Sequence, residues 1–148
     1  MRSVLVFCLV LAAAAAVAGH ASAADNPAAG QPQSKCPVSG EAVDTSVHVD
    51  YQGQRIYFCS AKCPAEFRKD PEKCFAKLEK DNVVLENIQT TCPVSGEKLG
   101  EGDMGAPVAH AYKGRTVMFC CKMCVAKFDK DPAKYLANLP GEQPAPAK

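Results

Sequence analysis

The chain has 148 residues, of which 17 are Lys or Arg, 16 are Asp or Glu and nine are Cys. This near balance of charge gives no electrostatic case for binding nucleic acid or an anionic membrane. The sequence also holds no Ser/His/Asp set, phosphate-binding loop or evident pair of catalytic carboxylates, so we expect a protein that is not an enzyme.

The N-terminus predicts a signal peptide over residues 1–23. Arg2 supplies a positive start, residues 4–17 form an apolar run, and residues 21–23 read Ala-Ser-Ala, which is a small-residue cleavage pattern. A membrane anchor is the alternative, because the run from residue 3 to residue 24 could just span a bilayer. The Ala-rich run and the cleavage pattern favour removal. We therefore expect an exported protein, periplasmic or extracellular, that is not stably inserted in a membrane.

Two segments without hydrophobic periodicity flank the patterned part of the chain. Residues 24–35 are rich in Pro, Ala, Gly and Gln and predict a flexible leader. Residues 140–148 hold three prolines and no large apolar side chain, and they predict a disordered tail. The ordered structure is therefore expected between residues 36 and 139.

The first patterned stretch, residues 36–80, opens with a cysteine-bearing turn and a β-hairpin. Residues 36–40 read Cys-Pro-Val-Ser-Gly, a tight turn in which the proline stiffens the backbone that presents the cysteine. Apolar residues alternate over 47–51, and a second apolar run covers 56–58. Gly53 lies between the two runs, so we predict a hairpin that turns at this glycine.

Helices are predicted for the remainder of this stretch. Residues 60–69 have apolar and charged side chains at helical spacing and follow the second strand directly. Asp70 and Pro71 then predict the start of another helix, with Asp as its N-cap and Pro in its first position. Residues 81–91 form a linker, in which residues 83–85 could add a short strand.

The second patterned stretch, residues 92–139, repeats the first. The Cys-Pro-Val-Ser-Gly turn returns at residues 92–96, and residues 112–139 align with residues 51–78 without a gap. The only change in length comes before the hairpin, where five additional residues fall in a Gly-rich loop around 99–107. The chain therefore contains two copies of one small module.

Six cysteines occupy matching positions in the two copies, three in each. They are Cys36, Cys59 and Cys63 in the first, and Cys92, Cys120 and Cys124 in the second. If a helix begins at the second cysteine of each trio, the last two lie on one helical face within reach of a single ion. The turn cysteine can then close the site from the other side. Three thiolates without an obvious fourth ligand suit Cu(I), or Zn(II) completed by another donor.

The other cysteines and the histidines do not repeat in this way. Cys74 is replaced by tyrosine in the second copy, so we expect it in the helix core. Cys121 matches Ser60 and is a candidate additional donor or redox partner in the second site only. His48 and His110 are out of register with each other when the copies are aligned, and we expect them on strand surfaces.

Two other functions compete with metal binding. An even number of cysteines in an exported chain normally suggests disulfides, although a trio would leave one thiol unpaired unless a bridge joined the modules. A thiol redox protein using Cys120, Cys121 and Cys124 is the third hypothesis, but the C-x-x-C formed by the last two has no counterpart in the first copy. A module of about 45 residues buries too little apolar surface to be stable without a metal, a disulfide or a neighbour.

The repeated pattern C-P-V-x-G, followed by Y-x-G-x-x-x-x-F-C-x-x-x-C-x-x-x-F-x-x-D-P, resembles the YHS domain and the related TRASH-type modules. The resemblance covers about residues 36–80 and 92–139. It implies an α+β fold of two tandem treble-clef-like modules, each with a Cys-Pro turn, a β-hairpin and short C-terminal helices. Phe-Cys-Cys at residues 119–121 resembles a double-cysteine variant of the family.

The resemblance also implies a function. YHS and TRASH-type modules are proposed to sense or carry metals, and the family motif marks the same six cysteines as ligands. Some members have cysteine where Ser39 and Ser95 stand, so the resemblance leaves the fourth ligand open. We therefore expect an exported carrier, buffer or sensor of Cu(I) or Zn(II), with a metal transporter or another protein as its partner.

Overall fold

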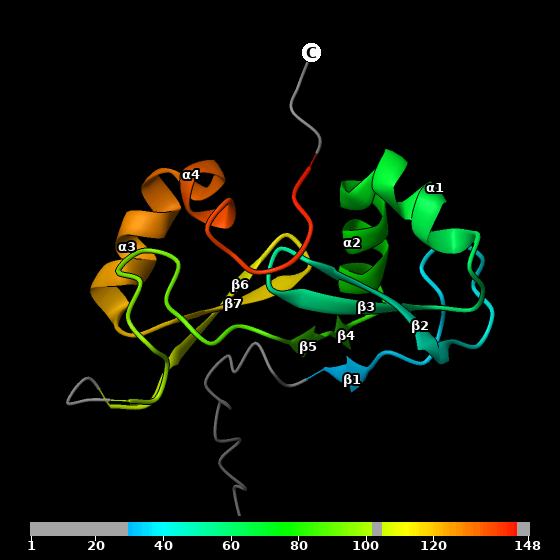
Figure 1. Cartoon of the computed structure of the whole chain (residues 1–148). Helices are drawn as coiled ribbons and strands as arrows, with labels where there is room; N and C mark the ends of the chain where they lie inside the picture. Colours follow the sequence, from blue (N-terminus) through cyan, green and yellow to red (C-terminus); the bar gives the residue numbers. More distant parts are fainter. Residues whose placement is uncertain (1–29, 102–104, 145–148) are drawn as a thin grey trace, which may run out of the picture.

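A computed structural model describes residues 30–101 and 105–144 and shows two α+β modules side by side (Figure 1). The expected fold class, two small cysteine-bearing modules with short strands and helices, is confirmed. The predicted signal peptide, most of the leader and the last four residues lie outside the described residues. Within the described ranges, no helix has the length and apolar character needed to cross a membrane.

The first module is built on the predicted hairpin. Strand β2 (Asp44–Tyr51) pairs antiparallel with β3 (Gln54–Phe58), and Tyr51 lies opposite Gln54 across the turn. The two turn residues, Gln52 and Gly53, have φ angles of 44° and 80°. Positive φ at both positions is the type I′ geometry that matches the twist of paired strands, and glycine adopts it without strain.

Two short helices follow the hairpin, α1 (Cys63–Lys69) and α2 (Pro71–Lys80). The N-cap prediction is confirmed, because the Asp70 carboxylate accepts a hydrogen bond of 3.1 Å from the Lys73 N–H. The expectation that the first helix begins at the second cysteine is wrong. Pro64 is tolerated only in the first turn of a helix, so α1 cannot extend far before it.

The linker forms the predicted additional strand as two short pieces. Strand β4 (Val83–Val84) pairs in parallel with β1 (Gln31–Pro32), and β5 (Glu86–Asn87) pairs with the start of β3. Residues 30–35 therefore differ from the flexible leader that we predicted. Composition indicated flexibility, but the backbone groups of β1 find partners on β4, which is distant in sequence.

The second module repeats this plan. Strands β6 (Val108–Tyr112) and β7 (Arg115–Phe119) form the hairpin, and helices α3 (Lys122–Lys130) and α4 (Pro132–Leu136) follow it. Its turn at residues 113–114 again has two positive φ angles, 46° and 73°. The position equivalent to Pro64 is a valine here, so α3 begins earlier relative to the motif than α1 does.

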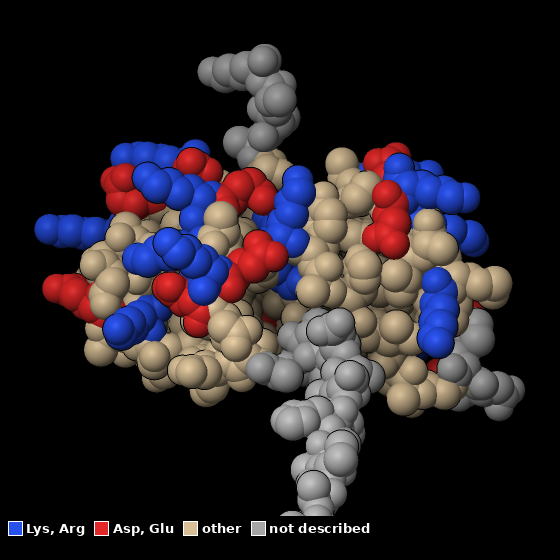
Figure 2. Space-filling model, turned by 180° about the vertical axis from the view of Figure 1, so that it is seen from behind, with Lys and Arg blue, Asp and Glu red and all other residues tan. Residues whose placement is uncertain are grey.

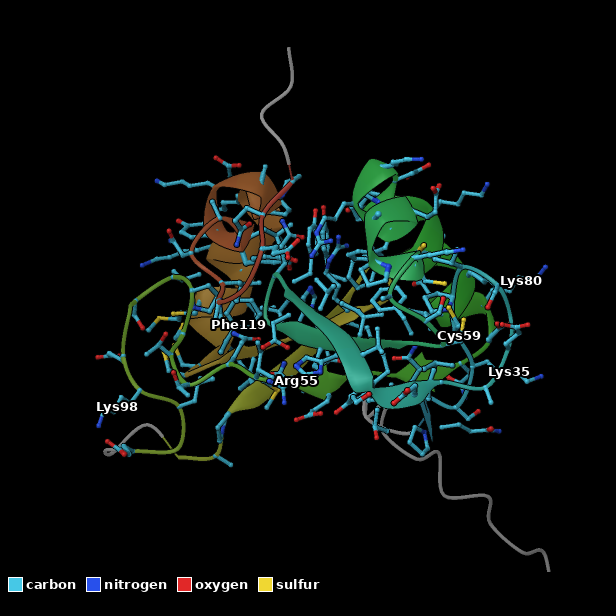
Figure 3. All side chains as sticks on the ribbon, turned by 45° about the vertical axis from the view of Figure 1, so that its right-hand side comes forward. Lys35, Arg55, Cys59, Lys80, Lys98 and Phe119 are labelled. Atoms are coloured by element: carbon cyan, nitrogen blue, oxygen red, sulfur yellow. The ribbon has the colours of Figure 1, made fainter. Side chains whose placement is uncertain are left out.

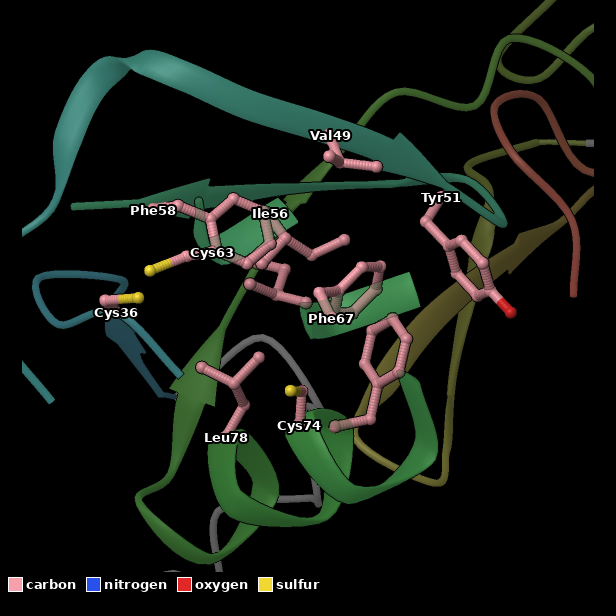
Figure 4. Close-up of a cluster of buried hydrophobic side chains, with 11 residues drawn as sticks. Cys36, Val49, Tyr51, Ile56, Phe58, Cys63, Phe67, Cys74 and Leu78 are labelled. Atoms are coloured by element: carbon pink, nitrogen blue, oxygen red, sulfur yellow. The ribbon is translucent and has the colours of Figure 1, made fainter. Parts of the chain in front are cut away.

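Each module has its own aromatic core. In the first, Phe58 packs edge-to-face on Phe67 with ring centroids 5.5 Å apart (Figure 4). In the second, Phe119 and Phe128 repeat the contact at 5.2 Å. All six repeated cysteines lie in or beside these two cores. The strand and helix that carry the cysteines are therefore held by close packing rather than by flexible loops.

The hairpin turn of each module contacts the other module. Gly53 donates its N–H to the Pro140 carbonyl at 2.7 Å, and Gly114 lies directly against the Phe75 backbone in α2. Arg115 is fully buried between the modules, where its guanidinium lies 3.8 Å from the centre of the Phe75 ring. These contacts supply the neighbouring surface that a module of this size needs.

Residues 140–143 differ from the disordered tail that we predicted. Glu142 donates its N–H to the Asp50 carbonyl at 2.7 Å and accepts from the Gln52 N–H at 3.1 Å. Its carboxylate also pairs with Arg68 at 2.6 Å. The end of the second module thus lies along β2 of the first, a long-range pairing that a Pro-rich composition does not reveal.

The surface carries charges of both signs. Figure 2 shows Lys and Arg interspersed with Asp and Glu over both modules, without a broad region of one sign on the face shown. This distribution agrees with the balanced composition.

Candidate metal centres

The turn cysteine of each module is held in a closed backbone loop. Cys36 donates its N–H to the Glu41 carbonyl at 2.7 Å, and its own carbonyl accepts from Gly40 at 2.9 Å. Cys92 and Gly96 form the same bond in the second module, at 2.8 Å. Gly40 and Gly96 have φ angles of 84° and 77°, which explains why glycine ends each turn. The loop fixes the direction of the cysteine side chain.

The other two cysteines of each trio flank the junction between strand and helix. Cys59 follows β3 directly, and Cys63 is the first residue of α1. The chain bends between them, so that the Cys63 N–H donates to the Ser60 carbonyl at 3.2 Å. The two sulfurs lie 3.5 Å apart. A bend, rather than a shared helical face, therefore brings this pair together.

The turn and the junction converge in both modules. The sulfurs of Cys36, Cys59 and Cys63 lie within 4.8 Å of one another, and so do those of Cys92, Cys120 and Cys124. Figure 4 shows Cys36 and Cys63 pointing toward each other from separate elements. Thiolates bound at about 2.3 Å to one tetrahedral ion would be about 3.8 Å apart, so the spacing fits a single soft ion.

One thiol in each trio is markedly acidic. Burial alone would raise the pKa of the Cys36 thiol, but hydrogen bonds from the Ser39 and Cys59 backbone and from the Ser39 hydroxyl outweigh it and lower the pKa to about 6. Burial likewise opposes ionisation of Cys92, yet hydrogen bonds from Ser95 and from the Cys120 backbone lower its pKa to about 7. Each site thus holds a thiolate ready for a cation near neutral pH.

The last thiol of each trio has its pKa shifted in the opposite direction. The Ser60 hydroxyl lowers the pKa of Cys63, but burial and the neighbouring Cys59 thiol outweigh it and raise the pKa overall. Burial and the Cys120 thiol together raise the pKa of Cys124. These thiols must lose their protons when an ion arrives, so we expect metal binding to release protons.

A serine from each Cys-Pro turn contacts the central sulfur. Ser39 Oγ lies 3.1 Å from Cys59 Sγ, and Ser95 Oγ lies 3.4 Å from Cys120 Sγ. A neutral hydroxyl is a hard donor that matches a soft ion poorly. We therefore interpret these serines as hydrogen-bonding groups that orient the sulfurs.

A repeated glutamine that sequence reasoning missed connects each turn to its strand. Gln33 accepts from the Tyr57 N–H at 2.9 Å and donates to the Tyr57 carbonyl at 2.7 Å. Gln89 makes the same two bonds with Met118, at 2.9 and 3.2 Å. Each glutamine lies three residues before a turn cysteine, and its partner lies two residues before the central cysteine. The signal was visible as Q-x-x-C-P-V-S-G in both copies.

The remaining candidate donors lie apart from the trios. Cys74 is buried in the first core on α2, as predicted, and Figure 4 shows its sulfur well away from Cys36 and Cys63. His110 contacts Asp129 at 3.0 Å, and His48 packs on a tyrosine ring. Within the described residues, neither histidine belongs to a group of converging metal donors.

Cys121 lies beside the second trio. Its sulfur is 3.9 Å from Cys120 Sγ and 3.7 Å from Cys124 Sγ. In the first module the Ser60 hydroxyl occupies this place, 3.9 Å from Cys59 Sγ and 3.5 Å from Cys63 Sγ. The two sites therefore share a trio but differ in the atom next to it.

The two trios lie at opposite ends of the molecule. The starts of β3 and β7 meet between the modules, where the Gln54 side chain donates to the Thr116 carbonyl at 2.8 Å. The strands then diverge, and Figure 3 shows Cys59 and Phe119, the residue before Cys120, on opposite sides. The arrangement fits two separate mononuclear sites.

Comparison with known proteins places the two modules in a family. The family model of the YHS domain matches residues 35–77 and 93–138. The first segment contains its whole trio, while the second contains two of its three cysteines and begins one residue after Cys92. Neither curated proteins nor solved structures gave a significant match.

Proposed function

Since the chain belongs to the YHS domain family and carries the domain twice, we propose that it is an exported protein that binds one thiophilic ion in each copy. The convergence of three sulfurs in each domain carries the proposal. A metal-binding role follows from the family and from this geometry together. Carrier, buffer or sensor is the physiological role that we propose, because each domain holds its own separate trio.

The donor set determines the class of ion. Among the described residues, three thiolates converge with no carboxylate or imidazole beside them, and such a set selects a soft or borderline cation. Cu(I) is satisfied by three sulfurs, whereas Zn(II) needs a fourth donor from a neighbour or water. We propose Cu(I) or Zn(II) as the ion, rather than Ca²⁺ or Mg²⁺, which take oxygen ligands.

The cellular setting is proposed from the sequence. The positive start, apolar run and Ala-Ser-Ala pattern of residues 1–23 support export to the periplasm or the extracellular space. An exported metal carrier must exchange its ion with another protein, and a metal transporter is the partner we propose. We propose no catalytic role, because every described group that converges in the two sites is a metal donor or a hydrogen-bonding neighbour of one.

A disulfide-stabilised interaction module is the second candidate. It is favoured by one observation, the 3.5 and 3.6 Å between the last two sulfurs of each trio. A bond of about 2.05 Å would need only a small approach of these atoms. The eight described cysteines are unbridged, and such a bridge would leave each acidic turn thiol without a partner.

The two candidates are separated by mass spectrometry of the exported protein, purified without reductant and alkylated under denaturing conditions. Metal binding predicts that all eight cysteines react after the ion is removed by a chelator. It also predicts that bound metal protects the trio thiols from alkylation in the folded protein. Failure to alkylate four cysteines, with a mass lower by two hydrogens per bridge, would support the disulfide module instead.

A further inference from the structure

The two sites differ at one position that contacts the trio. This position lies three residues before the last cysteine, and it is Ser60 in the first site and Cys121 in the second. Both side chains lie within 4 Å of two trio sulfurs. The exchange of oxygen for sulfur at this point changes the number of soft donors.

The position of Cys121 at the start of α3 accounts for this proximity. Cys121 is the N-cap residue of the helix and Cys124 is its third residue, and side chains at these two positions approach each other across the first turn. An N-cap side chain ordinarily accepts a backbone hydrogen bond, but that of Cys121 makes none within the described part of the chain. Its sulfur contacts the sulfurs of Cys120 and Cys124 instead.

The distances among these three sulfurs match a tetrahedral site. They are 3.6, 3.7 and 3.9 Å, against about 3.8 Å for the edge of a tetrahedron of thiolates around one ion. Cys92 lies within 4.8 Å of Cys120 and Cys124 and supplies the fourth corner. Cys121 does not belong to the group of sulfurs that converge with Cys92 within 4.8 Å, so the last edge of the tetrahedron forms only when a bound ion draws these two sulfurs together.

The first site cannot complete a tetrahedron in this way. A serine hydroxyl keeps its proton at neutral pH and is a hard donor, so Ser60 is a poor ligand for a soft ion. Its contact with Cys63 Sγ, at 3.5 Å, is a hydrogen bond to a ligand rather than a ligand bond. The first site therefore offers three thiolates.

On the premise that the protein binds metal as proposed above, we propose that Cys121 is a direct ligand, so that the second site is a four-thiolate site and the first a three-thiolate site. Four thiolates suit a tetrahedral divalent ion of the Zn(II) class, and three suit Cu(I). The protein then holds two different ions at its two ends. Its two domains differ in selectivity although their folds repeat.

Cobalt(II) tests this assignment, because its visible absorption reports tetrahedral thiolate coordination and grows with the number of sulfurs. The reduced mature protein, Cys121→Ser and Ser60→Cys are titrated with Co(II) under anaerobic conditions. The two substitutions exchange the residues that the two domains already use, so each is a matched control for the other. Cu(I) binding at the unaltered site shows that each variant is folded.

We expect one tightly bound Co(II) with a four-sulfur spectrum in the unaltered protein. Cys121→Ser should lower the Co(II) affinity of this site by roughly 100-fold or more. Removal of an outer-shell partner already costs up to about 100-fold, and removal of a direct ligand should cost at least as much. Ser60→Cys should create a second site with the same spectrum. Equal Co(II) affinity and spectra in the unaltered protein and Cys121→Ser would overturn the assignment while leaving metal binding intact. Absence of Co(II), Zn(II) and Cu(I) binding in the unaltered protein would overturn the proposed function itself.

Discussion

The first and the last cysteine of each trio differ in the pKa of their thiols. The turn thiols Cys36 and Cys92 have their pKa values lowered to about 6 and about 7, because backbone N–H groups and a serine hydroxyl stabilise the thiolate. Cys63 and Cys124 have theirs raised, chiefly by burial and neighbouring thiols. A metal-free site that holds one thiolate avoids the cost of burying three negative charges together. Its single negative charge also attracts an incoming cation.

These shifts predict how the stability of the metal-free protein depends on pH. A cysteine thiol ordinarily has a pKa of 9.0, and the folded protein lowers this to about 6 for Cys36. Stability from the Cys36 thiolate is therefore fully present above pH 9 and is lost as the pH falls through 6. We expect the free energy of unfolding to rise between about pH 6 and 8, measured by denaturant titration with reductant and chelator present.

The control for this prediction is a pH titration of the metal-free protein in which thiolate formation is followed by ultraviolet absorbance. Cys36→Ser should remove the more acidic of two ionisation steps and leave the step of Cys92. A metal-free protein in which no thiol ionises below about pH 8 would contradict the assigned charge state.

Elements with a local sequence signal were predictable, and those held by distant partners were not. The hairpins followed from alternation around Gly53 and Gly114, and the helix starts from Asp70 and the equivalent Asp131. The strand formed by residues 31–32 and the ordered residues 140–143 depend on partners roughly 50 or more residues away, which composition cannot indicate.

The same distinction applies to the site. Repetition identified which cysteines converge, because both copies retain them at matching positions of the motif although the loop before the hairpin differs in length. Their geometry was predicted incorrectly, because Pro64 delays the helix and a bend brings Cys59 to Cys63 instead. The role of Gln33 was missed for another reason. A side chain that bonds to the backbone of a distant strand leaves no periodic pattern, although its repetition at Gln89 was a usable signal.

Gln33 and Gln89 each bond to the strand before one trio, so we predict that each positions only the site beside it. Gln33→Ala removes both bonds to the Tyr57 backbone, which we expect to cost about 1–2 kcal/mol of stability. Because these bonds fix the Cys-Pro turn against the strand, metal affinity at the first site should fall about 10-fold. Affinity at the second site should be unchanged, as measured by competition with a chromophoric chelator.

Gln89→Ala is the reciprocal variant and should weaken only the second site. Equal losses of metal affinity at both sites from either substitution would show a general effect on folding. Unchanged affinity at both sites would show that the glutamines do not position the cysteines.

At the scale of the whole molecule, contacts between the modules add to the small core that each has of its own. Arg115 is buried between them, where it pairs with Glu72 and covers the Phe75 ring. Gly114 lies so close to the Phe75 backbone that a Cβ atom there would overlap the carbonyl. The two cysteine trios lie at the far ends of their hairpins, away from this contact.

Gly114→Ala is expected to destabilise the protein by about 2–4 kcal/mol, which combines the strain of a positive φ with overpacking against α2. Gly105→Ala is the matched control. Gly105 also has a positive φ, 78°, but among the described residues no atom lies within 4 Å of the point that a Cβ atom would occupy, so only the strain of about 1–2 kcal/mol should remain. Denaturant unfolding of the two variants measures the difference, and equal losses would contradict the packing of the turn on α2.

The central claim, that each domain binds one ion through its own trio, is tested most directly by native mass spectrometry of the reduced mature protein after loading with Cu(I). The account predicts two ions on the unaltered protein and one on either Cys36→Ser or the double variant Cys92→Ser/Cys121→Ser, since each leaves only two thiols in one of the two sites. Retention of two ions by both variants, or an unaltered protein that binds none, would contradict it.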